Sequence, residues 1–303
     1  MISPSSLSSP RSDPIGLIGL GLVGSELAHR LRAAGRPVIG YDINAERLAE
    51  FTQLGGSAAG SAAGVFSACE RVLVSLPSHR EVTNVCALHA TSFRPGTTII
   101  DTTTGDPASS EAIAASLQAQ GITYLDATIS GSSKQVRDGS AVMMVGGDAA
   151  GFAACLDIFN LLADATFHTG PSGSGAKMKL VTNLVLGLNR AALAEGLAFA
   201  EGLSLDLPLV LKIMRRSPAY SRAMDAKGDK MIQQEFAPEA RLSQHLKDVR
   251  LIVEAGLASG LPMSLSQAHR DILERAETQG LGELDNSAII RVLSARHPAK
   301  PGA

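Results

Sequence analysis

Residues 15–24 read Ile-Gly-Leu-Ile-Gly-Leu-Gly-Leu-Val-Gly, an apolar segment that runs directly into the pattern Gly-x-Gly-x-x-Gly and then into a helical segment. A strand that turns into a helix in this way directs backbone N–H groups and a helix N-terminus at one place, which suits a pyrophosphate. The first glycine permits the tight turn, the second lets the backbone approach the phosphates, and the third lets the helix pack closely on the strand. The segment therefore predicts a dinucleotide-binding fold whose cofactor-binding residues are Gly19, Leu20, Gly21, Leu22, Val23 and Gly24.

An acidic residue stands where a ribose-binding carboxylate belongs, about twenty residues further along the chain. The apolar segment 38–41 ends at Asp42, and the first arginine after it is Arg47. A carboxylate there accepts hydrogen bonds from both ribose hydroxyls and repels a 2′-phosphate, so Asp42 favours NAD over NADP. The alternative is an ordinary glycine turn and a surface aspartate, but the agreement of strand, glycines, helix and acid favours the dinucleotide.

Composition and charge narrow the class of protein. The chain has 303 residues, of which 45% are hydrophobic and 18% charged, and its formal net charge is −2. That charge supplies no basic field for nucleic acid, and no apolar run reaches the roughly 18 residues that a membrane span needs. The Ser- and Pro-rich residues 1–14 lack the apolar core of a signal peptide, so we expect a disordered leader there.

The three cysteines indicate a reducing compartment. Cys69, Cys86 and Cys155 have no metal-ligand spacing, and three thiols cannot all pair. We therefore expect buried, reduced thiols and a cytoplasmic protein. The histidines and carboxylates also lack ligand spacing, so no metal is expected.

Strand and helix signals alternate through the first half of the chain. Short apolar segments lie at 38–41, 72–76, 97–101, 124–127 and 141–145, and helical segments separate most of them. This order predicts an α/β domain with a Rossmann-type, doubly wound and mainly parallel sheet. We expect this dinucleotide-binding domain to span residues 15–171.

The pattern changes after residue 171. A Gly- and Ser-rich loop is followed by one long helical segment, 177–201, that is apolar nearly all round, which predicts a buried helix. Further helical segments follow with no clear strand, at 207–216, 241–259, 264–278 and 286–294. We therefore expect an all-helical second domain over residues 172–303, joined to the first by the long helix.

Lys179, in the first turns of that long helix, is the candidate catalytic residue. A lysine that faces an apolar cleft loses hydration, which lowers its pKa toward the range useful for proton transfer, and a positive nicotinamide ring acts in the same direction. Asn183 lies four residues on, so both side chains leave one face of the helix. The alternative is a lysine that extends to solvent beside a domain surface.

The polar ends of the expected strands are the other candidates, because ligands bind beyond the carboxyl ends of strands in open α/β sheets. Leu76 and Pro77 end one strand, Thr104 lies in the polar segment 101–107, and Ser130 lies in the segment 126–132. Taken singly, each segment is also an ordinary turn.

Together these residues resemble the β-hydroxyacid dehydrogenases, the family of 3-hydroxyisobutyrate dehydrogenase, tartronate semialdehyde reductase and the NAD-binding part of 6-phosphogluconate dehydrogenase. The resemblance covers nearly the whole chain. Four segments carry it: Gly-Leu-Gly-Leu-Val-Gly at 19–24, Asp-Ala-Thr-Ile-Ser-Gly-Ser at 126–132, Gly-Ser-Gly-Ala-Lys-Met-Lys-Leu-Val-Thr-Asn at 173–183, and Lys-Asp at 247–248.

The resemblance implies a role for each matching position. Lys179 aligns with the catalytic lysine, and Asn183 aligns with an asparagine that holds substrate. Ser130, Gly131 and Ser132 align with the substrate loop, whereas Thr104 and Lys247 align with residues near the cofactor. The family's helical domain forms dimers or tetramers through its long helix, so a homo-oligomer is implied. The implied reaction is NAD-dependent hydride transfer between the nicotinamide and the hydroxyl of a small β-hydroxy acid, with Lys179 as general acid and base.

Several positions depart from the family pattern. Thr128 replaces a proline and Ser132 replaces a glycine in the substrate loop, and Thr182 replaces the first asparagine of a pair. Segment 240–245, which includes Arg241, lacks the family's aromatic and apolar residues. We expect these changes to favour a more polar substrate, such as a hydroxylated sugar acid.

Two alternatives stay open. An imine reductase shares the architecture, but such enzymes commonly lack a lysine at the position of Lys179. A catalytically silent nucleotide-binding protein would keep residues 19–42 and lose the catalytic set, which this chain retains.

Overall fold

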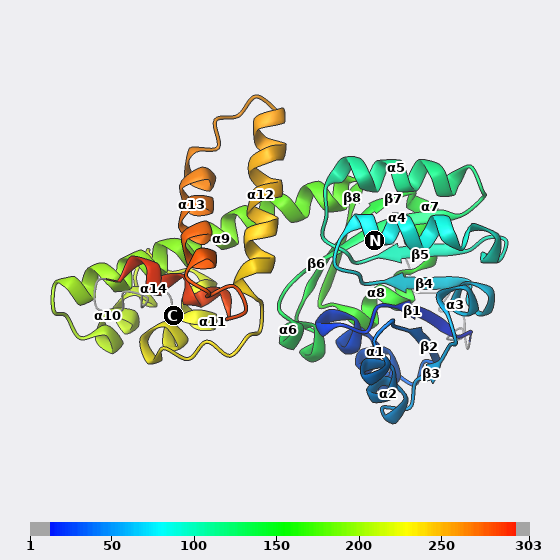
Figure 1. The fold of residues 1–303 in the computed structure, drawn as a ribbon, viewed down its shortest axis with the longest axis horizontal. Helices are drawn as coiled ribbons and strands as arrows, with labels where there is room; N and C mark the ends of the chain where they lie inside the picture. The colour runs from blue at the N-terminus through cyan, green and yellow to red at the C-terminus, as the bar shows by residue number, and fades with distance from the viewer. Residues whose placement is uncertain (1–12, 295–303) are drawn as a thin grey trace, which may run out of the picture. The chain divides into compact units, whose positions relative to one another are not determined.

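A computed structural model describes residues 13–294, and the chain divides into two compact units, residues 1–179 and 180–303. Most of the expected leader, residues 1–12, lies outside the described part. Within that part, no helix is both long and apolar enough to cross a membrane. Figure 1 shows the order of the elements along the chain.

The first unit is built on one eight-stranded sheet with the order β3-β2-β1-β4-β5-β6-β7-β8. Neighbouring strands are parallel except β6 and β7, which are antiparallel. β7 reverses direction because the chain returns after one short helix, with Ser130 opposite Val142. The mainly parallel, doubly wound sheet expected from the sequence is confirmed. The strands are Ile15–Ile18, Val38–Tyr41, Ser57–Ala58, Arg71–Val74, Thr98–Asp101, Thr123–Ser130, Val142–Gly147 and Ala165–Gly170.

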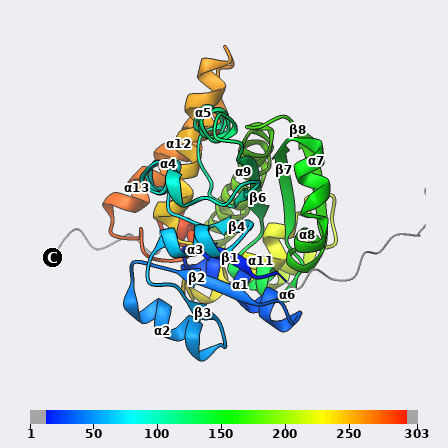
Figure 2. The ribbon, with the colours of Figure 1, turned by 90° about the vertical axis from the view of Figure 1, so that its right-hand side faces the viewer.

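Helices cover both faces of the sheet, and each face has its own apolar cluster (Figure 2). Alternate strand residues point to opposite sides, so Leu73 joins one cluster while Val72 and Val74 join the other. One cluster includes residues from α1 (Leu22–Ala33), α6 (Ser133–Asp138) and α8 (Leu156–Leu162). The other includes residues from α3 (Ala62–Ala68), α4 (His79–Leu88) and α5 (Pro107–Gln118). The remaining elements of this unit are α2 (Ala45–Gln53), η1 (Ala90–Ser92) and α7 (Ala149–Ala154).

The second unit is helical in its described part and has a separate apolar core. The helix α9 (Ser174–Gly202) begins in the first unit and continues through the second. α12 and α13 pack against each other, and η2 packs against α12. The elements after α9 are α10 (Leu207–Met214), α11 (Arg222–Gln233), α12 (Leu242–Ala258), α13 (Ser264–Thr278), η2 (Asn286–Ile289) and α14 (Ile290–Leu293).

The expectation that α9 is buried all round is wrong. Its buried positions recur every three or four residues, in the series Ala176, Leu180, Asn183, Gly187, Arg190, Leu193 and Leu197. Val181, Val185 and Phe199 lie more than half exposed on the remaining surface. One face of a helix provides a single stripe of contacts. The apolar residues outside that stripe are not covered by any of residues 13–294.

Several elements were missed in the sequence, among them β3, α3, α6, β8 and α11. The edge strand β8 has two exposed residues, Phe167 and His168, so it lacks the apolar run that marks a buried strand. α11 is rich in charged residues and contains Gly228, which hides its periodicity. Between β7 and β8 the chain forms two short helices, α7 and α8, which are separated at Cys155.

Candidate active site

The candidate site of the first unit lies at the carboxyl ends of its parallel strands. β1, β2, β4, β5 and β6 all run in the same direction, so the segments that follow them leave the same edge of the sheet. These segments are the glycine turn, Asp42, residues 75–78, residues 102–106 and residues 130–132. This is the edge at which open α/β sheets bind their ligands.

The glycine turn has the geometry that the sequence predicts. Gly19 has a φ of 94°, a conformation that favours glycine, and a Cβ at Gly24 would lie 2.0 Å from the Gly19 carbonyl oxygen. Gly21 is the N-cap of α1, and no side chain caps the helix there. A Cβ on Gly21 would have only the Arg47 guanidinium within 4 Å, at 3.8 Å. The turn therefore presents the start of α1 to an open side, as a pyrophosphate requires.

Asp42 ties the end of β2 to this turn. Its Oδ2 accepts a hydrogen bond from the Leu20 N–H at 2.7 Å, and its Oδ1 accepts one from Asn44 at 2.8 Å. The Arg47 guanidinium lies 3.9 Å from Oδ2, so this arginine is closer to the carboxylate than its place in the sequence suggests. A carboxylate has about four acceptor positions, and the ones left can still receive ribose hydroxyls.

The segments after β4 and β5 are joined to each other. The Leu76 N–H donates to the Thr103 hydroxyl at 3.1 Å, and the Thr102 N–H donates to the Val74 carbonyl at 2.8 Å. Leu76 and Thr104 are half-buried and Pro77 is exposed. The three candidates therefore lie in two cross-linked segments at one edge of the sheet.

Two hydroxyl groups in and just after β6 form hydrogen bonds within the protein. The Thr128 side chain is fully buried and donates to the Gly175 carbonyl at 3.0 Å, so its hydroxyl is directed away from solvent. Ser132 caps α6: its Oγ accepts from Gln135 N–H, while the Gln135 side chain accepts from the Ser132 N–H. The Thr128 hydroxyl therefore offers nothing to a substrate, contrary to the expectation from the sequence, whereas the cap uses only one acceptor position of the Ser132 hydroxyl. Ser130 and Gly131 are half-buried.

Lys179 is buried at the end of the same strand. Its side chain is 8% exposed, and Nζ donates to the Ile129 carbonyl oxygen at 2.6 Å. Ile129 directly precedes Ser130, so the structure brings the candidate base next to the candidate substrate loop. Lys177, by contrast, is exposed and forms an ion pair with Glu111.

A buried carboxylate fixes the start of α9, and sequence reasoning gave it no role. Asp126 in β6 accepts hydrogen bonds from the Gly173 and Ala176 N–H groups, both at 2.9 Å. Burial raises the pKa of Asp126, and the two backbone hydrogen bonds oppose that rise. The carboxylate thus caps the helix N-terminus a little over one turn before Lys179. The sign in the sequence is that Asp126 begins the segment 126–132, one of those that carry the family resemblance.

Two candidates belong to the second unit. Asn183 is 6% exposed, and its Nδ2 donates to Asp248 Oδ2 at 3.0 Å. Lys247 is half-buried and precedes that aspartate on α12. This hydrogen bond connects the Lys-Asp segment at 247–248 to the asparagine of α9.

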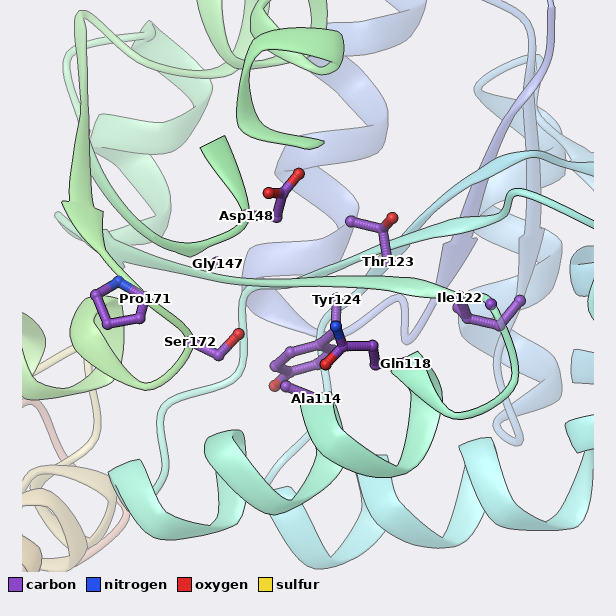
Figure 3. A pocket seen from close by; sticks show the side chains of 10 residues that line it. Ala114, Gln118, Ile122, Thr123, Tyr124, Gly147, Asp148, Pro171 and Ser172 are labelled. Atoms are coloured by element: carbon purple, nitrogen blue, oxygen red, sulfur yellow. The ribbon is translucent and has the colours of Figure 1, made fainter. Parts of the chain in front are cut away.

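A hollow of about 480 Å³ in the first unit lies elsewhere (Figure 3). It is lined by residues from the end of α5, the start of β6 and the segment after β8, including Gln118, Thr123, Asp148 and Ser172. Because β6 begins there, the hollow is at the opposite edge of the sheet from the glycine turn. Among residues 13–294, no cluster of three or more His, Cys, Asp or Glu side chains is arranged to hold a metal ion.

Comparisons with known proteins agree with this geometry. Residues 14–170 match the NAD-binding domain of 6-phosphogluconate dehydrogenase, and residues 173–293 match the "NAD-binding of NADP-dependent 3-hydroxyisobutyrate dehydrogenase". A 2-(hydroxymethyl)glutarate dehydrogenase from Eubacterium barkeri is 31% identical over 93% of this chain and 95% of its own. An L-threonate dehydrogenase from Cupriavidus necator is 28% identical over 92% of this chain and 95% of its own. A solved Mycobacterium tuberculosis 3-hydroxyisobutyrate dehydrogenase is 25% identical with a TM-score of 0.87, covering 94% of this chain and all of that one.

Proposed function

This chain belongs to the 3-hydroxyisobutyrate dehydrogenase-like β-hydroxyacid dehydrogenases, NAD(P)-dependent oxidoreductases, and from that premise we propose that it oxidises and reforms a small, polar β-hydroxy acid with Lys179 as acid and base. The observation that carries the proposal is the position of Lys179 Nζ, buried and 2.6 Å from the carbonyl of Ile129 beside Ser130. No other described lysine in the first unit is buried.

The residues at the glycine turn fit a dinucleotide. The uncapped start of α1 and the open side of Gly21 suit a pyrophosphate, and Asp42 suits a ribose. We assign the cofactor to residues 15–171, with Leu76, Pro77 and Thr104 toward its reactive end and Lys247 contributing from the helical domain, residues 172–303. When bound, the nicotinamide supplies the hydride acceptor or donor.

In the direction of oxidation, Lys179 takes the proton of the substrate hydroxyl as the carbon-bound hydrogen leaves with its electron pair. In the direction of reduction, the ammonium of Lys179 returns a proton to the forming alkoxide. A positioned acid–base group contributes about 10²–10⁴-fold to the rate. Ser130 and Gly131 orient the substrate carboxylate, Asn183 holds the substrate near the hydroxyl, and Ser132 shapes the loop through its cap. Orientation of this kind adds a further part of the rate.

The choice of NAD over NADP rests on Asp42. Its carboxylate is 9% exposed and is held by two backbone N–H groups, so a 2′-phosphate at the ribose would meet a fixed negative charge. Arg47 is the one feature nearby that favours a phosphate.

A polar substrate is supported by the relatives. Thr128 donates its hydroxyl to Gly175 inside the protein, so it no longer supports such a substrate. Two relatives act, by name, on 2-(hydroxymethyl)glutarate and L-threonate, which carry a second carboxylate or further hydroxyls.

A homo-oligomer, a dimer or a tetramer, is part of the proposal. Phe199, Leu203 and Leu209 in the second unit are more than half exposed, and so are Leu205 and Ile213 nearby in sequence. Contiguous exposed apolar residues of this kind mark protein interfaces. The three buried cysteines agree with a cytoplasmic location.

A panel of acids tests the function. Purified protein is mixed with NAD or NADP and with threonate, 2-(hydroxymethyl)glutarate or 3-hydroxyisobutyrate, and the absorbance of the reduced nicotinamide is followed. We expect turnover with NAD and a higher kcat/KM for a polar acid. A clear preference for 3-hydroxyisobutyrate contradicts the substrate class, and turnover of a cyclic imine without turnover of any acid contradicts the reaction.

A further inference from the structure

A buried histidine lies behind the segment that carries Thr104. His79 is the first residue of α4, and its side chain is 4% exposed. Its Nδ1 lies 3.1 Å from the carbonyl oxygen of Asp106. A carbonyl oxygen only accepts hydrogen bonds, so Nδ1 carries the proton in this contact. The imidazole therefore connects the start of α4 to the far end of the segment 102–106.

The other nitrogen of the ring faces the near end of the same segment. His79 Nε2 lies 3.7 Å from Asp101 Oδ2, and Asp101 is fully buried. Asp101 accepts hydrogen bonds from the Tyr124 hydroxyl at 2.7 Å and from the Thr103 N–H at 2.8 Å. A buried carboxylate is stable only when it is surrounded by such partners. Asp101 thus fixes the first residues of the segment, and His79 is one of the groups that surround it.

The imidazole also packs directly on the backbone at Gly105. A Cβ built there would lie 2.4 Å from His79 Nδ1 and 2.5 Å from its Cγ. No side chain fits at this position while the ring keeps its place. His79 therefore contacts the chain before Thr104, at Asp101, and after it, at Gly105 and Asp106.

We propose that His79 is a positioning residue for the reaction: its contacts with Asp101, Gly105 and Asp106 hold residues 102–106, and with them Thr104, in the conformation that receives the nicotinamide end of the cofactor. This inference rests on the proposed function, which places Thr104 at that end. Loss of the contacts weakens catalysis and nicotinamide binding, and it leaves binding of the adenosine half at Gly19–Asp42 intact.

Three variants of His79 separate its hydrogen bond from its packing. His79→Asn puts an amide N–H close to the place of Nδ1–H, His79→Gln moves the amide toward the place of Nε2, and His79→Phe keeps a ring without donors. His89→Phe is the matched control, since His89 is a half-buried histidine just after α4 whose ring lies beside Phe66. We expect His79→Phe and His79→Gln to lower kcat about 10–100-fold, because a displaced group near the reacting atoms has effects of that size. His79→Asn keeps most of the activity, and His89→Phe keeps all of it.

Binding measurements supply a readout that needs no turnover. The ligands are the reduced cofactor that the wild type prefers and the matching fragment without nicotinamide, ADP-ribose or its 2′-phosphate. We expect His79→Phe to lower the affinity for the reduced cofactor by about fivefold or more, the equivalent of roughly 1 kcal/mol. The affinity for the fragment should stay unchanged. Amide hydrogen exchange of residues 102–106 in the cofactor-free protein should rise in the same variant.

Gly105→Ala provides a second variant if His79→Phe folds poorly, since it disturbs the same contact from the opposite side. Parallel loss of fragment and cofactor affinity, or unchanged exchange and unchanged affinities in both variants, would overturn the inference. The proposed reaction and the positioning role of His79 can fail separately. If the wild type oxidises no hydroxy acid, the proposed reaction is wrong. If His79→Phe still loses affinity for the cofactor and not for the fragment, the positioning role of His79 is supported.

Discussion

Asp42 shows how one side chain serves both the fold and cofactor choice. It accepts two backbone N–H groups and lies 3.9 Å from Arg47, so its charge is held at a fixed place beside the glycine turn. Asp42→Asn keeps the shape and removes the charge. Because a hydrogen bond to a charged group contributes about 1.5–3 kcal/mol, we expect the ratio of NADP to NAD affinity to rise about 10–100-fold.

Titration of both cofactors against Asp42→Asn and Arg47→Ala measures this effect. Arg47→Ala is the control and should leave NAD affinity within about threefold, since its side chain is half exposed and such charges contribute about 0–1 kcal/mol. Tighter binding of NADPH than of NADH by the wild type would contradict the account.

A separate prediction concerns Ser132, whose hydroxyl caps the N-terminus of α6. Ser132→Ala should lower the free energy of unfolding by about 1 kcal/mol, the usual cost of losing an N-cap. Ser133→Ala, one residue on, should change it by less than about 0.5 kcal/mol. Both variants should rank the acids as the wild type does. A changed ranking in Ser132→Ala alone would restore the substrate contact expected from the sequence.

The sequence identifies single residues best where the backbone conformation requires one residue type. Gly19 and Gly24 are predicted from the strand-turn-helix pattern, and the positive φ of the first and the 2.0 Å approach of the second confirm that reading. Thr128 was misread because the partner of a hydroxyl is not visible in a sequence. His79 and Asp101 were missed for the same reason, since 22 residues separate them along the chain.

At the scale of elements, Asp126 determines where α9 begins. Its carboxylate accepts from Gly173 and Ala176, and the helix then carries Lys179 to Ile129. Asp126→Asn replaces one acceptor by a donor that faces a backbone N–H. We expect the start of α9 to shift and kcat to fall about 10²-fold, since a displacement of about 1 Å has effects of that size.

Asp148→Asn is the matched control for Asp126→Asn. Asp148 caps α7 through the Gly151 N–H, and that helix carries none of the proposed site residues. It should change stability by less than about 0.5 kcal/mol, because asparagine caps a helix about as well as aspartate does, and it should retain full kcat. Equal kcat in the two variants would show that the cap of α9 has no part in catalysis.

The elements that the sequence predicts well are those with a clear period. The parallel strands of the first unit and α12 and α13 lie close to their expected ranges. β8 and α11 were missed because exposed or charged residues interrupt their pattern. α9 was predicted as an element and misjudged in burial, because its sequence is apolar also on the face that residues 13–294 leave exposed.

At the scale of the whole molecule, two buried groups predict loss of stability in acid, and both belong to the second unit. Burial, followed by the charge of Arg190, lowers the pKa of His269 to about 4 from 6.5. Burial alone raises the pKa of Asp285, but the Lys227 ammonium and hydrogen bonds from Lys227 and Ser287 outweigh it and lower that pKa to about 2.

Both shifts have the same sign. The folded chain binds fewer protons than the unfolded chain between pH 6.5 and 4 at His269, and between pH 3.8 and 2 at Asp285. The free energy of unfolding is therefore highest above these pH ranges and falls as the pH is lowered through them. The loss is about 3 kcal/mol for His269 and about 2 kcal/mol for Asp285. Urea unfolding at pH 7, 5 and 4 checks this, and His269→Leu should flatten the profile above pH 4. A profile of His269→Leu that parallels the wild type would contradict the assignment.

The central claim is that the amine of Lys179 moves the substrate proton, and turnover of Lys179→Ala compared with its NAD affinity tests it most directly. Lys177→Ala is the matched control, because its side chain is exposed and paired with Glu111. We predict that Lys179→Ala loses about 10²–10⁴-fold in kcat and binds NAD as the wild type does, while Lys177→Ala retains both. Turnover that survives in Lys179→Ala, or cofactor affinity that falls in parallel with turnover, would contradict the account.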